Sequence, residues 1–194
     1  MADMIPEETT RLFQFLSELG LDSESIEAAF LGTKPLSLRG SEVLLTQNSE
    51  QKCGYFILSG ILRACHFGEQ GVVRCKEFYF PGELCFLYTS WLTGEPAQYQ
   101  IESLDKARVI QLPLSLLSEP KWIPAQLNLL KQQLLFKEQK EAFLLLKTPE
   151  QRYQHLLADW PLWAENLNNI QLASYIGISP ESLSRLKARL NSLA

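Results

Sequence analysis

The residues with the clearest chemical pattern lie at 169–190, in the segment NIQLASYIGISPESLSRLKARL. A glycine follows a short apolar helical stretch, and a serine and a proline then open a second stretch with leucines at helical spacing. Gly177 suits the backbone of a tight turn, while Ser179 and Pro180 are typical of an N-cap and a first helical position. This order predicts a helix-turn-helix, in which the second helix reads base edges in the major groove of DNA.

The polar residues of that second helix are the candidate DNA-binding residues. Arg185 is suited to guanine and Glu181 to cytosine, and the two share one helical face because they are four residues apart. Serine hydroxyls and Arg189 are suited to phosphates. The full predicted set is Ser179, Glu181, Ser182, Ser184, Arg185 and Arg189. The alternative interpretation is a helical hairpin that only packs.

Metal and redox chemistry has less support in the sequence. Cysteines occur at Cys53, Cys65, Cys75 and Cys85, ten or more residues apart, so no CxxC motif is present, and the chain has two histidines. We expect no metal site, no catalytic residues, and cysteines that stay reduced within strands. A symmetric hairpin about residues 69 and 70 pairs Cys65 with Arg74. This register predicts that Cys65 and Cys75 point to opposite faces and form no disulfide, unless a one-residue bulge intervenes.

Composition places these residues in an ordinary globular chain. Of 194 residues, 46% are hydrophobic and 21% are charged, and the formal net charge is −4. This charge excludes a broad basic coat for nucleic acid, although residues 148–194 balance four basic against four acidic side chains. No stretch has the roughly 20 apolar residues of a membrane helix, and the first residues lack the apolar core of a secretory signal. We therefore expect a cytoplasmic protein with no membrane partner.

Short elements are predicted through the first two thirds of the chain. Residues 7–30 have the apolar spacing of short helices. From about Pro35 to Pro113 the chain is rich in β-branched and aromatic residues and is interrupted by glycine turns. This composition and turn spacing are typical of antiparallel strands in a sandwich, roll or barrel. The predicted strand segments are 42–47, 54–60, 61–67, 72–80 and 107–112.

Helices are predicted in the remaining third. The segment 124–147 is one long helix in which Leu127, Leu130 and Leu134 have the spacing of a coiled-coil seam, as in a dimerisation helix. The alternative is that this helix only covers the β-rich region. Thr148, with Pro149 and Gln151 after it, then begins an all-helical region through a capping box. The predicted domains are a sensor domain at 1–122, a linker and dimerisation helix at 123–147, and a helix-turn-helix domain at 148–194.

Several segments together resemble the Crp/Fnr superfamily of bacterial transcription regulators, in the short type common in the Bacteroidetes. They are YFILSGILRA (55–64), PGEL (81–84), the long helix after Pro124, TPEQRYQHLL (148–157) and IQLASYIGISPESLSRLKARL (170–190). The resemblance covers almost the whole chain and implies an α+β fold. Its parts would be an antiparallel β-roll (a double-stranded β-helix) of the cyclic-nucleotide-binding type, a dimerising central helix and a C-terminal all-α helix-turn-helix domain. It implies a homodimer that binds an inverted repeat in double-stranded DNA, with a small-molecule effector and RNA polymerase as further candidate partners.

The resemblance also places an effector pocket at Gly82, Glu83, Leu84, Ala97, Gln98 and Tyr99. In nucleotide-binding relatives a glutamate that matches Glu83 holds the ribose, and an arginine that would fall near residues 97–99 holds the phosphate. This chain has no arginine there, and the loss of a bidentate cation removes the strongest phosphate contact. We therefore expect that cyclic AMP is not the effector, that the sensor domain either responds to another ligand or is vestigial, and that Glu83 caps a turn.

Other features of the superfamily are also missing. No cysteine precedes Cys53, and His66 is the one histidine of the β-rich region, so we expect no iron–sulfur cluster, haem or other cofactor. Many members continue into a strand-built wing after the second helix. This chain stops at Ala194, so wing contacts to DNA are not expected.

Two other function classes compete with a transcription regulator. The first is a ligand-sensing or protein-interaction module whose helical domain does not read DNA, which the neutral charge of residues 148–194 supports. The second is a metalloenzyme on a cupin-like β-roll, which needs two or three histidines on neighbouring strands, whereas the β-rich region has His66 alone. We predict a regulator that is not an enzyme.

Overall fold

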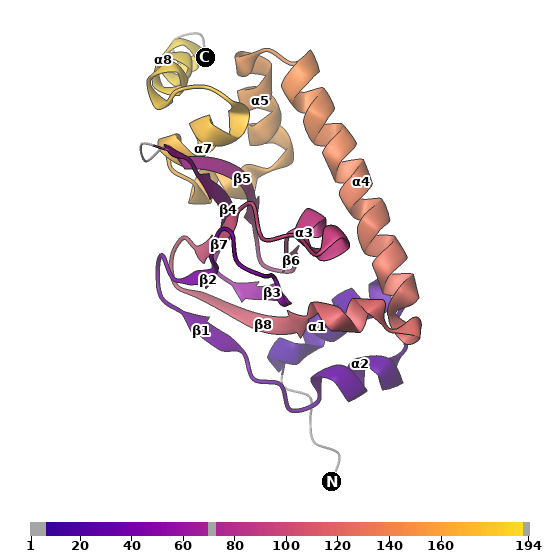
Figure 1. Ribbon diagram of the computed structural model, residues 1–194. Coiled ribbons are helices and arrows are strands. Elements are labelled where there is room, and N and C mark those ends of the chain that lie inside the picture. The colour runs from indigo at the N-terminus through magenta and orange to yellow at the C-terminus, as the bar shows by residue number, and fades with distance from the viewer. Residues whose placement is uncertain (1–6, 70–72, 192–194) are drawn as a thin grey trace. The chain divides into compact units, whose positions relative to one another are not determined.

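The computed structural model describes residues 7–69 and 73–191 of the chain (Figure 1). It combines helices with two antiparallel sheets, which confirms the predicted α+β class. The chain divides into two compact units, one up to residue 132 and one from residue 133, and the division falls within the long helix α4 (Ile123–Leu146). Within the described ranges, no helix is both long and apolar enough to cross a membrane.

The first unit contains a β-roll built from two four-stranded sheets of described residues (Figure 1). One sheet has the strand order β1-β8-β3-β6 and the other has the order β2-β7-β4-β5, and neighbouring strands are antiparallel. The strands are β1 (Leu36–Leu38), β2 (Val43–Leu45), β3 (Cys53–Ser59), β4 (Leu62–Phe67), β5 (Val73–Tyr79), β6 (Leu84–Cys85), β7 (Gln100–Ser103) and β8 (Ala107–Pro113). Side chains from both sheets, such as Ile57 and Ile101, meet in one fully buried apolar core.

Three strands and one helix of this unit are absent from the sequence prediction. β1 and β6 contain three and two residues, and β7 contains four, which is too short for an alternating pattern to be visible. The short helix α3 (Tyr88–Thr93) follows β6 and ends at Gly94, whose φ is 72°. The predicted tight turn at residues 68–71 lies partly outside the described residues.

Helices cover the outer face of the β3–β8 pair. The predicted short helices are present as α1 (Glu7–Glu18) and α2 (Ser23–Phe30). Asp22 caps α2, because Ser25 N donates to Asp22 Oδ1 at 2.7 Å. The 3₁₀ turns η2 (Leu114–Ser118) and η3 (Pro120–Trp122) lead into α4. The second apolar core of the unit combines α1, α2, β3, β8, Trp122 of η3 and the start of α4, where Ala125 and Leu129 are buried.

The hairpin of β4 and β5 does not have the symmetric register that the sequence predicts. Cys65 lies opposite Cys75, and the register shifts between Ala64, which pairs with Glu77, and Cys65. Lys76 is therefore the extra residue of a β-bulge. The prediction that the two cysteines point to opposite faces is wrong, because directly opposed residues of an antiparallel pair share a face.

The second unit is helical. After the C-terminal part of α4 it contains α5 (Pro149–Asp159), α6 (Pro161–Asn166), α7 (Asn169–Ile176) and α8 (Pro180–Asn191). The predicted capping box begins α5: Gln151 N donates to Thr148 Oγ1 at 3.3 Å, and Thr148 N donates to Gln151 Oε1 at 2.9 Å. Trp163 and Tyr175 pack edge to face with ring centroids 4.4 Å apart, within an aromatic cluster. This cluster joins α6 to α7.

Candidate functional site

The strongest candidate site is the helix-turn-helix of α7 and α8. Asn168 caps α7 reciprocally with Gln171: Gln171 N donates to Asn168 Oδ1 at 3.0 Å, and Asn168 N donates to Gln171 Oε1 at 2.8 Å. The helix ends at Gly177, which has φ 77° and ψ 35°, a left-handed conformation that glycine adopts without strain. Ile178 N then donates to Ala173 O at 3.0 Å and turns the chain toward α8.

Packing against α7 determines which face of α8 is exposed to solvent. Leu183 is fully buried and Leu186 is 8% exposed, and both pack with the buried side chains of α7. Ala173 has no exposed surface, so its small side chain lets the two helices approach closely. Five of the six predicted DNA-binding residues are exposed and Ser182 is half-buried, so the predicted set lies away from the core; the exposed five are Ser179, Glu181, Ser184, Arg185 and Arg189.

The first turn of α8 is capped by its own side chains. Ser182 N donates to Ser179 Oγ at 3.2 Å, which makes Ser179 the N-cap that the sequence predicts. Glu181 lies in the same turn, and hydrogen bonds from its own backbone amide and from the Ser179 hydroxyl lower the pKa of its carboxyl. A carboxylate here stabilises the helix N-terminus but opposes an approaching phosphate. Ser179 and Glu181 therefore stabilise the first turn of α8, which is also where base contacts are predicted.

The three basic residues of α8 differ in their contacts. Arg189 forms an ion pair with Glu150 of α5, and Lys187 Nζ donates to Asn169 Oδ1 at 2.5 Å. Arg185 Nη2 donates to Ser182 Oγ at 3.3 Å, within its own helix. Arg185 can therefore turn toward a ligand at the cost of one weak contact, whereas Arg189 and Lys187 must leave partners on other helices.

Arg152 of α5 is a site-supporting residue that the sequence analysis missed. Its guanidinium donates to three backbone carbonyls: Leu144 O at 2.6 Å, Lys147 O at 3.0 Å and Ile176 O at 2.8 Å. These carbonyls lie at the ends of α4 and α7, where helical partners are lacking. Arg152 thus joins the helix-turn-helix to α4. No motif in the sequence marks this role, because its three acceptors are backbone atoms.

The predicted effector residues 82–84 form a closed turn. Phe80 N donates to Glu83 Oε2 at 2.9 Å, and Glu83 N donates to Phe80 O at 3.1 Å. Gly82 N donates to Ile57 O at 2.8 Å, so the amides of this turn are already used. Desolvation and, to a smaller extent, the charge of the nearby Glu77 raise the pKa of Glu83 to about 7, against the lowering effect of the hydrogen bond from Phe80 N. The carboxylate therefore caps the turn, the role that the sequence analysis favours for it.

The other predicted effector residues lie apart from that turn. Ala97 is fully buried, and its amide donates to Ser49 O at 2.8 Å. Gln98 and Tyr99 line a cavity of about 440 Å³ at the end of β4 and β5. The other residues lining this cavity are Gln47, Asn48, His66, Arg74, Cys75 and Lys76. The structure therefore does not gather the six predicted effector residues around this cavity.

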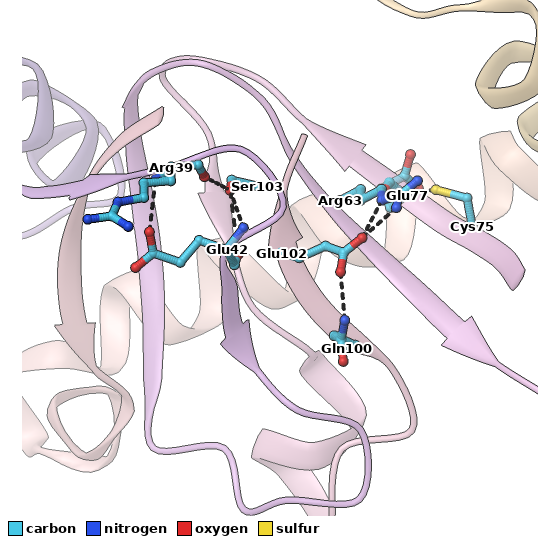
Figure 2. Close-up of polar contacts among 8 residues, drawn as sticks. All are labelled: Arg39, Glu42, Arg63, Cys75, Glu77, Gln100, Glu102 and Ser103. Carbon is cyan, nitrogen blue, oxygen red and sulfur yellow. Dashed lines mark hydrogen bonds and ion pairs between the residues drawn. The ribbon is translucent and has the colours of Figure 1, made fainter. Parts of the chain in front are cut away.

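A polar cluster on β4 and β7 is a second feature that the sequence analysis missed. Arg63 lies directly opposite Glu102, and Arg63 Nε donates to Glu102 Oε1 at 2.8 Å (Figure 2). Gln100 Nε2 donates to the other carboxylate oxygen at 2.6 Å. The side chains of Arg63 and Glu102 are 26% and 7% exposed. Residues 39 chain positions apart form this pair, so only the strand register could reveal it.

Figure 2 also shows a link between the start of β2 and the end of β7. Ser103 Oγ donates to Arg39 O at 2.5 Å and accepts from Glu42 N at 3.0 Å. Arg39 N donates to Glu42 Oε2 at 2.8 Å. These contacts tie the loop before β2 to the sheet and satisfy the buried Ser103 hydroxyl, so we read them as structural.

The predicted seam leucines of α4 are exposed or half-buried. Leu127 and Leu134 are 60% and 62% exposed, and Leu130 is half-buried. The buried positions Ala125 and Leu129 lie on the other face of the helix. One face of α4 thus covers the core while the face with the predicted seam carries exposed leucines.

The described residues contain no group of three or more His, Cys, Asp or Glu side chains placed to hold a metal ion. All four cysteines lie in strands, as predicted, and they are free thiols.

Comparison with known proteins identifies the β-roll. Residues 35–119 match the family model of the cyclic nucleotide-binding domain. No curated protein sequence matches the chain.

Solved structures share the fold over most of the chain. FixK2 from Bradyrhizobium japonicum has 17% identity and a TM-score of 0.66, covering 84% of this chain and 86% of its own. The c-di-GMP-responsive global regulator CLP from Xanthomonas campestris has 14% identity and a TM-score of 0.68, covering 88% and 92%. A transcriptional regulator of the CRP/FNR family from Thermus thermophilus, TTHA1359, has 17% identity and a TM-score of 0.67, covering 83% and 87%. The predicted resemblance to Crp/Fnr regulators is therefore confirmed at the level of the fold.

Proposed function

We propose that this chain, with a cyclic nucleotide-binding domain and the Crp/Fnr fold, is a dimeric, DNA-binding transcription regulator whose effector is not cyclic AMP. The observation that carries the proposal is the helix-turn-helix of α7 and α8, with a buried leucine face on α8 and Arg185 exposed on the opposite face. The first half of such a helix is the part that enters a major groove.

Arg185 is the residue proposed to read a base. Its guanidinium has five donors in a planar fork that fits guanine O6 and N7. It holds only a 3.3 Å contact within its own helix, so little is lost when it turns to DNA. Arg189 is proposed to meet a phosphate by exchanging its ion pair with Glu150, an exposed contact of small energetic value.

Dimerisation through α4 is proposed from its exposed leucines. A two-fold dimer places two copies of α8 about 34 Å apart, one turn of DNA, which suits an inverted repeat. Leu127 and Leu134 lie seven residues apart and are more than half exposed, as a coiled-coil seam without its partner would be.

We expect Leu127→Asp with Leu134→Asp to give a monomeric mass by light scattering, and Leu92→Asp, an exposed leucine of α3, to leave the mass unchanged. A monomeric mass for the unaltered chain at micromolar concentration would contradict the dimer.

The exclusion of cyclic AMP is proposed from the charges of the effector turn. A cyclic phosphodiester needs cationic or amide donors. Residues 97–99, where the resemblance places the arginine of relatives, contain none; the amide of Ala97 already donates to Ser49 O, and Glu83 and Glu77 place two carboxyl groups near each other. Calorimetry with cyclic AMP and cyclic GMP should show no micromolar binding. Saturable binding of either, with a change in DNA affinity, would refute this part.

The test of the whole proposal is binding-site selection from random double-stranded DNA, followed by titration of the selected site at two salt concentrations. We expect an inverted repeat and an affinity that falls steeply with salt, because phosphate contacts release counterions. Failure to enrich any sequence would overturn the assignment.

The second candidate, a protein-interaction module, is favoured by two observations. Residues 148–194 carry no net charge, and two of the three cations of α8 have partners on other helices. No DNA enrichment in that test would support it.

A further inference from the structure

We propose that Cys65 and Cys75 form a reversible disulfide across the β4–β5 hairpin, which makes this hairpin a redox modification site. The inference does not depend on DNA binding. It starts from the bulge at Lys76, which places the two cysteines directly opposite each other. Directly opposed residues in antiparallel strands have Cα atoms about 4.5–5.5 Å apart, and disulfides span about 4.4–6.8 Å between Cα atoms. The backbone therefore needs no rearrangement of the strands for the bond to form.

The two thiols also differ in acidity. A hydrogen bond between the two thiols lowers the pKa of Cys65, and the Arg63 guanidinium lowers it further. The same hydrogen bond, followed by desolvation, raises the pKa of Cys75. Glu102 holds Arg63 on this face of the sheet through the ion pair in Figure 2, where Cys75 is drawn beside them. Cys65 is therefore the thiol of the pair that ionises more readily, and the Cys75 thiol also donates to Glu77 O at 3.5 Å.

An oxidant has access to one of the two sulfurs. Cys65 is fully buried, whereas Cys75 is half-buried and lines the cavity of about 440 Å³. Arg74 and Lys76 line the same cavity, and their positive charges favour a departing anion. Cys75 is therefore the sulfur that meets the oxidant, and Cys65 is the sulfur that resolves it.

The reaction balances with hydrogen peroxide as the oxidant. The Cys75 sulfur attacks one peroxide oxygen while its proton passes to the Cys65 thiolate; the O–O bond breaks, and hydroxide leaves and takes a proton from solvent. Cys75 is then a sulfenic acid. The Cys65 sulfur attacks the Cys75 sulfur, the S–O bond breaks, and the hydroxyl leaves as water with the Cys65 proton. Two thiols and one peroxide have become one disulfide and two waters, and a dithiol reductant reverses the change.

The other two cysteines provide the comparison. Cys53 is half-buried, as Cys75 is, but it lies in β3 opposite Pro113 and so has no facing thiol. Burial raises the pKa of Cys53. Cys53→Ser is therefore a matched control, because it removes a thiol of similar exposure that is outside the pair.

The experiment is peptide mapping of the full chain after mild peroxide treatment, with free thiols alkylated under denaturing conditions. Trypsin cleaves after Arg63, Arg74 and Lys76, so Cys65 falls on peptide 64–74 and Cys75 on peptide 75–76. We expect these two peptides to be joined in the unaltered chain and in Cys53→Ser, and to separate after dithiothreitol. We expect the peptide that contains Cys53 to enter no disulfide, because Cys53 has no facing thiol.

Cys75→Ser and Cys65→Ser should each abolish the joined peptide while circular dichroism shows an unchanged fold. If Cys65→Ser does not fold, Cys75→Ser alone decides, because Cys75 is only half-buried. Oxidation of the unaltered chain without a 64–74 to 75–76 link would overturn the proposal, as would a link from either peptide to the one that contains Cys53 or Cys85.

Discussion

Replacing Arg152 with methionine should weaken the attachment of the helix-turn-helix to the rest of its unit. The arginine donates to Leu144 O, Lys147 O and Ile176 O, and methionine keeps the apolar part of the side chain while removing every donor. The buried Ile176 ends α7 immediately before the Gly177 turn. We therefore expect Arg152→Met to destabilise the turn that orients α8.

The size of the effect follows from these three bonds. Hydrogen bonds from a charged donor contribute about 1.5–3 kcal/mol each. The three bonds share one side chain, so their contributions are not additive. Leu144 and Lys147 are half-buried, so water can replace the guanidinium at two of the three carbonyls. We therefore expect a loss of about 2–4 kcal/mol, set mainly by the carbonyl of Ile176.

Amide hydrogen exchange measures the stability of the second unit by itself. A melting curve of the whole chain would combine the unfolding of both units. Peptides within 149–191 should exchange faster in Arg152→Met by the factor that ~2–4 kcal/mol implies, while peptides of the first unit stay unchanged. The matched control is Arg185→Met in the same unit, where one 3.3 Å contact is lost and protection should be retained. Arg152→Lys should recover only part of the protection, because one ammonium cannot reach three carbonyls in a planar fork. If Arg152→Met and Arg185→Met exchange alike, the reasoning is wrong.

Four further predictions concern single positions. Leu183→Ala, at a fully buried site, should cost the second unit about 3–5 kcal/mol in hydrogen exchange or denaturant unfolding and leave the β-roll folded. Gly60→Ala should destabilise the first unit by more than about 2 kcal/mol, because a methyl group there would lie 2.5 Å from Lys106 O at a φ of 79°; normal unfolding of this variant would contradict the turn geometry. Arg185→Ala should lose about 1–3 kcal/mol of affinity on the selected DNA site and less on scrambled DNA, and equal losses on both would make Arg185 a phosphate contact. The pKa of Glu83, raised from 4.5 to about 7, means that the folded chain holds this proton more tightly than the unfolded chain, so its contribution to stability falls as pH rises from about 4.5 to about 7. Glu83→Gln keeps the acceptor for Phe80 N and should flatten that part of the pH profile by less than about 1 kcal/mol, because solvent at the exposed part of the Glu83 side chain screens a charge that is only partly desolvated; identical profiles would refute the assignment.

Elements whose contacts are local could be predicted from the sequence. The capping boxes at Thr148 and Asn168 join residues three positions apart, and the turn at Gly177 depends on its own backbone freedom. Leucine spacing of three and four fixes which face of α8 is buried. The helix-turn-helix, the bounds of α4 and the antiparallel β-rich region were predictable for this reason, since each is encoded within a few neighbouring residues.

Contacts between residues far apart in the sequence depend on strand register and helix packing. One extra residue at Lys76 placed Cys65 opposite Cys75 and reversed the prediction from a symmetric hairpin. Strand pairing also brought Arg63 to Glu102, and helix packing directed the donors of Arg152 onto three backbone carbonyls. A side-chain period of two makes each one-residue shift in register exchange the two faces of a strand. The residues of the turn do not predict this shift in register, because the packing of the whole sheet determines where a bulge forms.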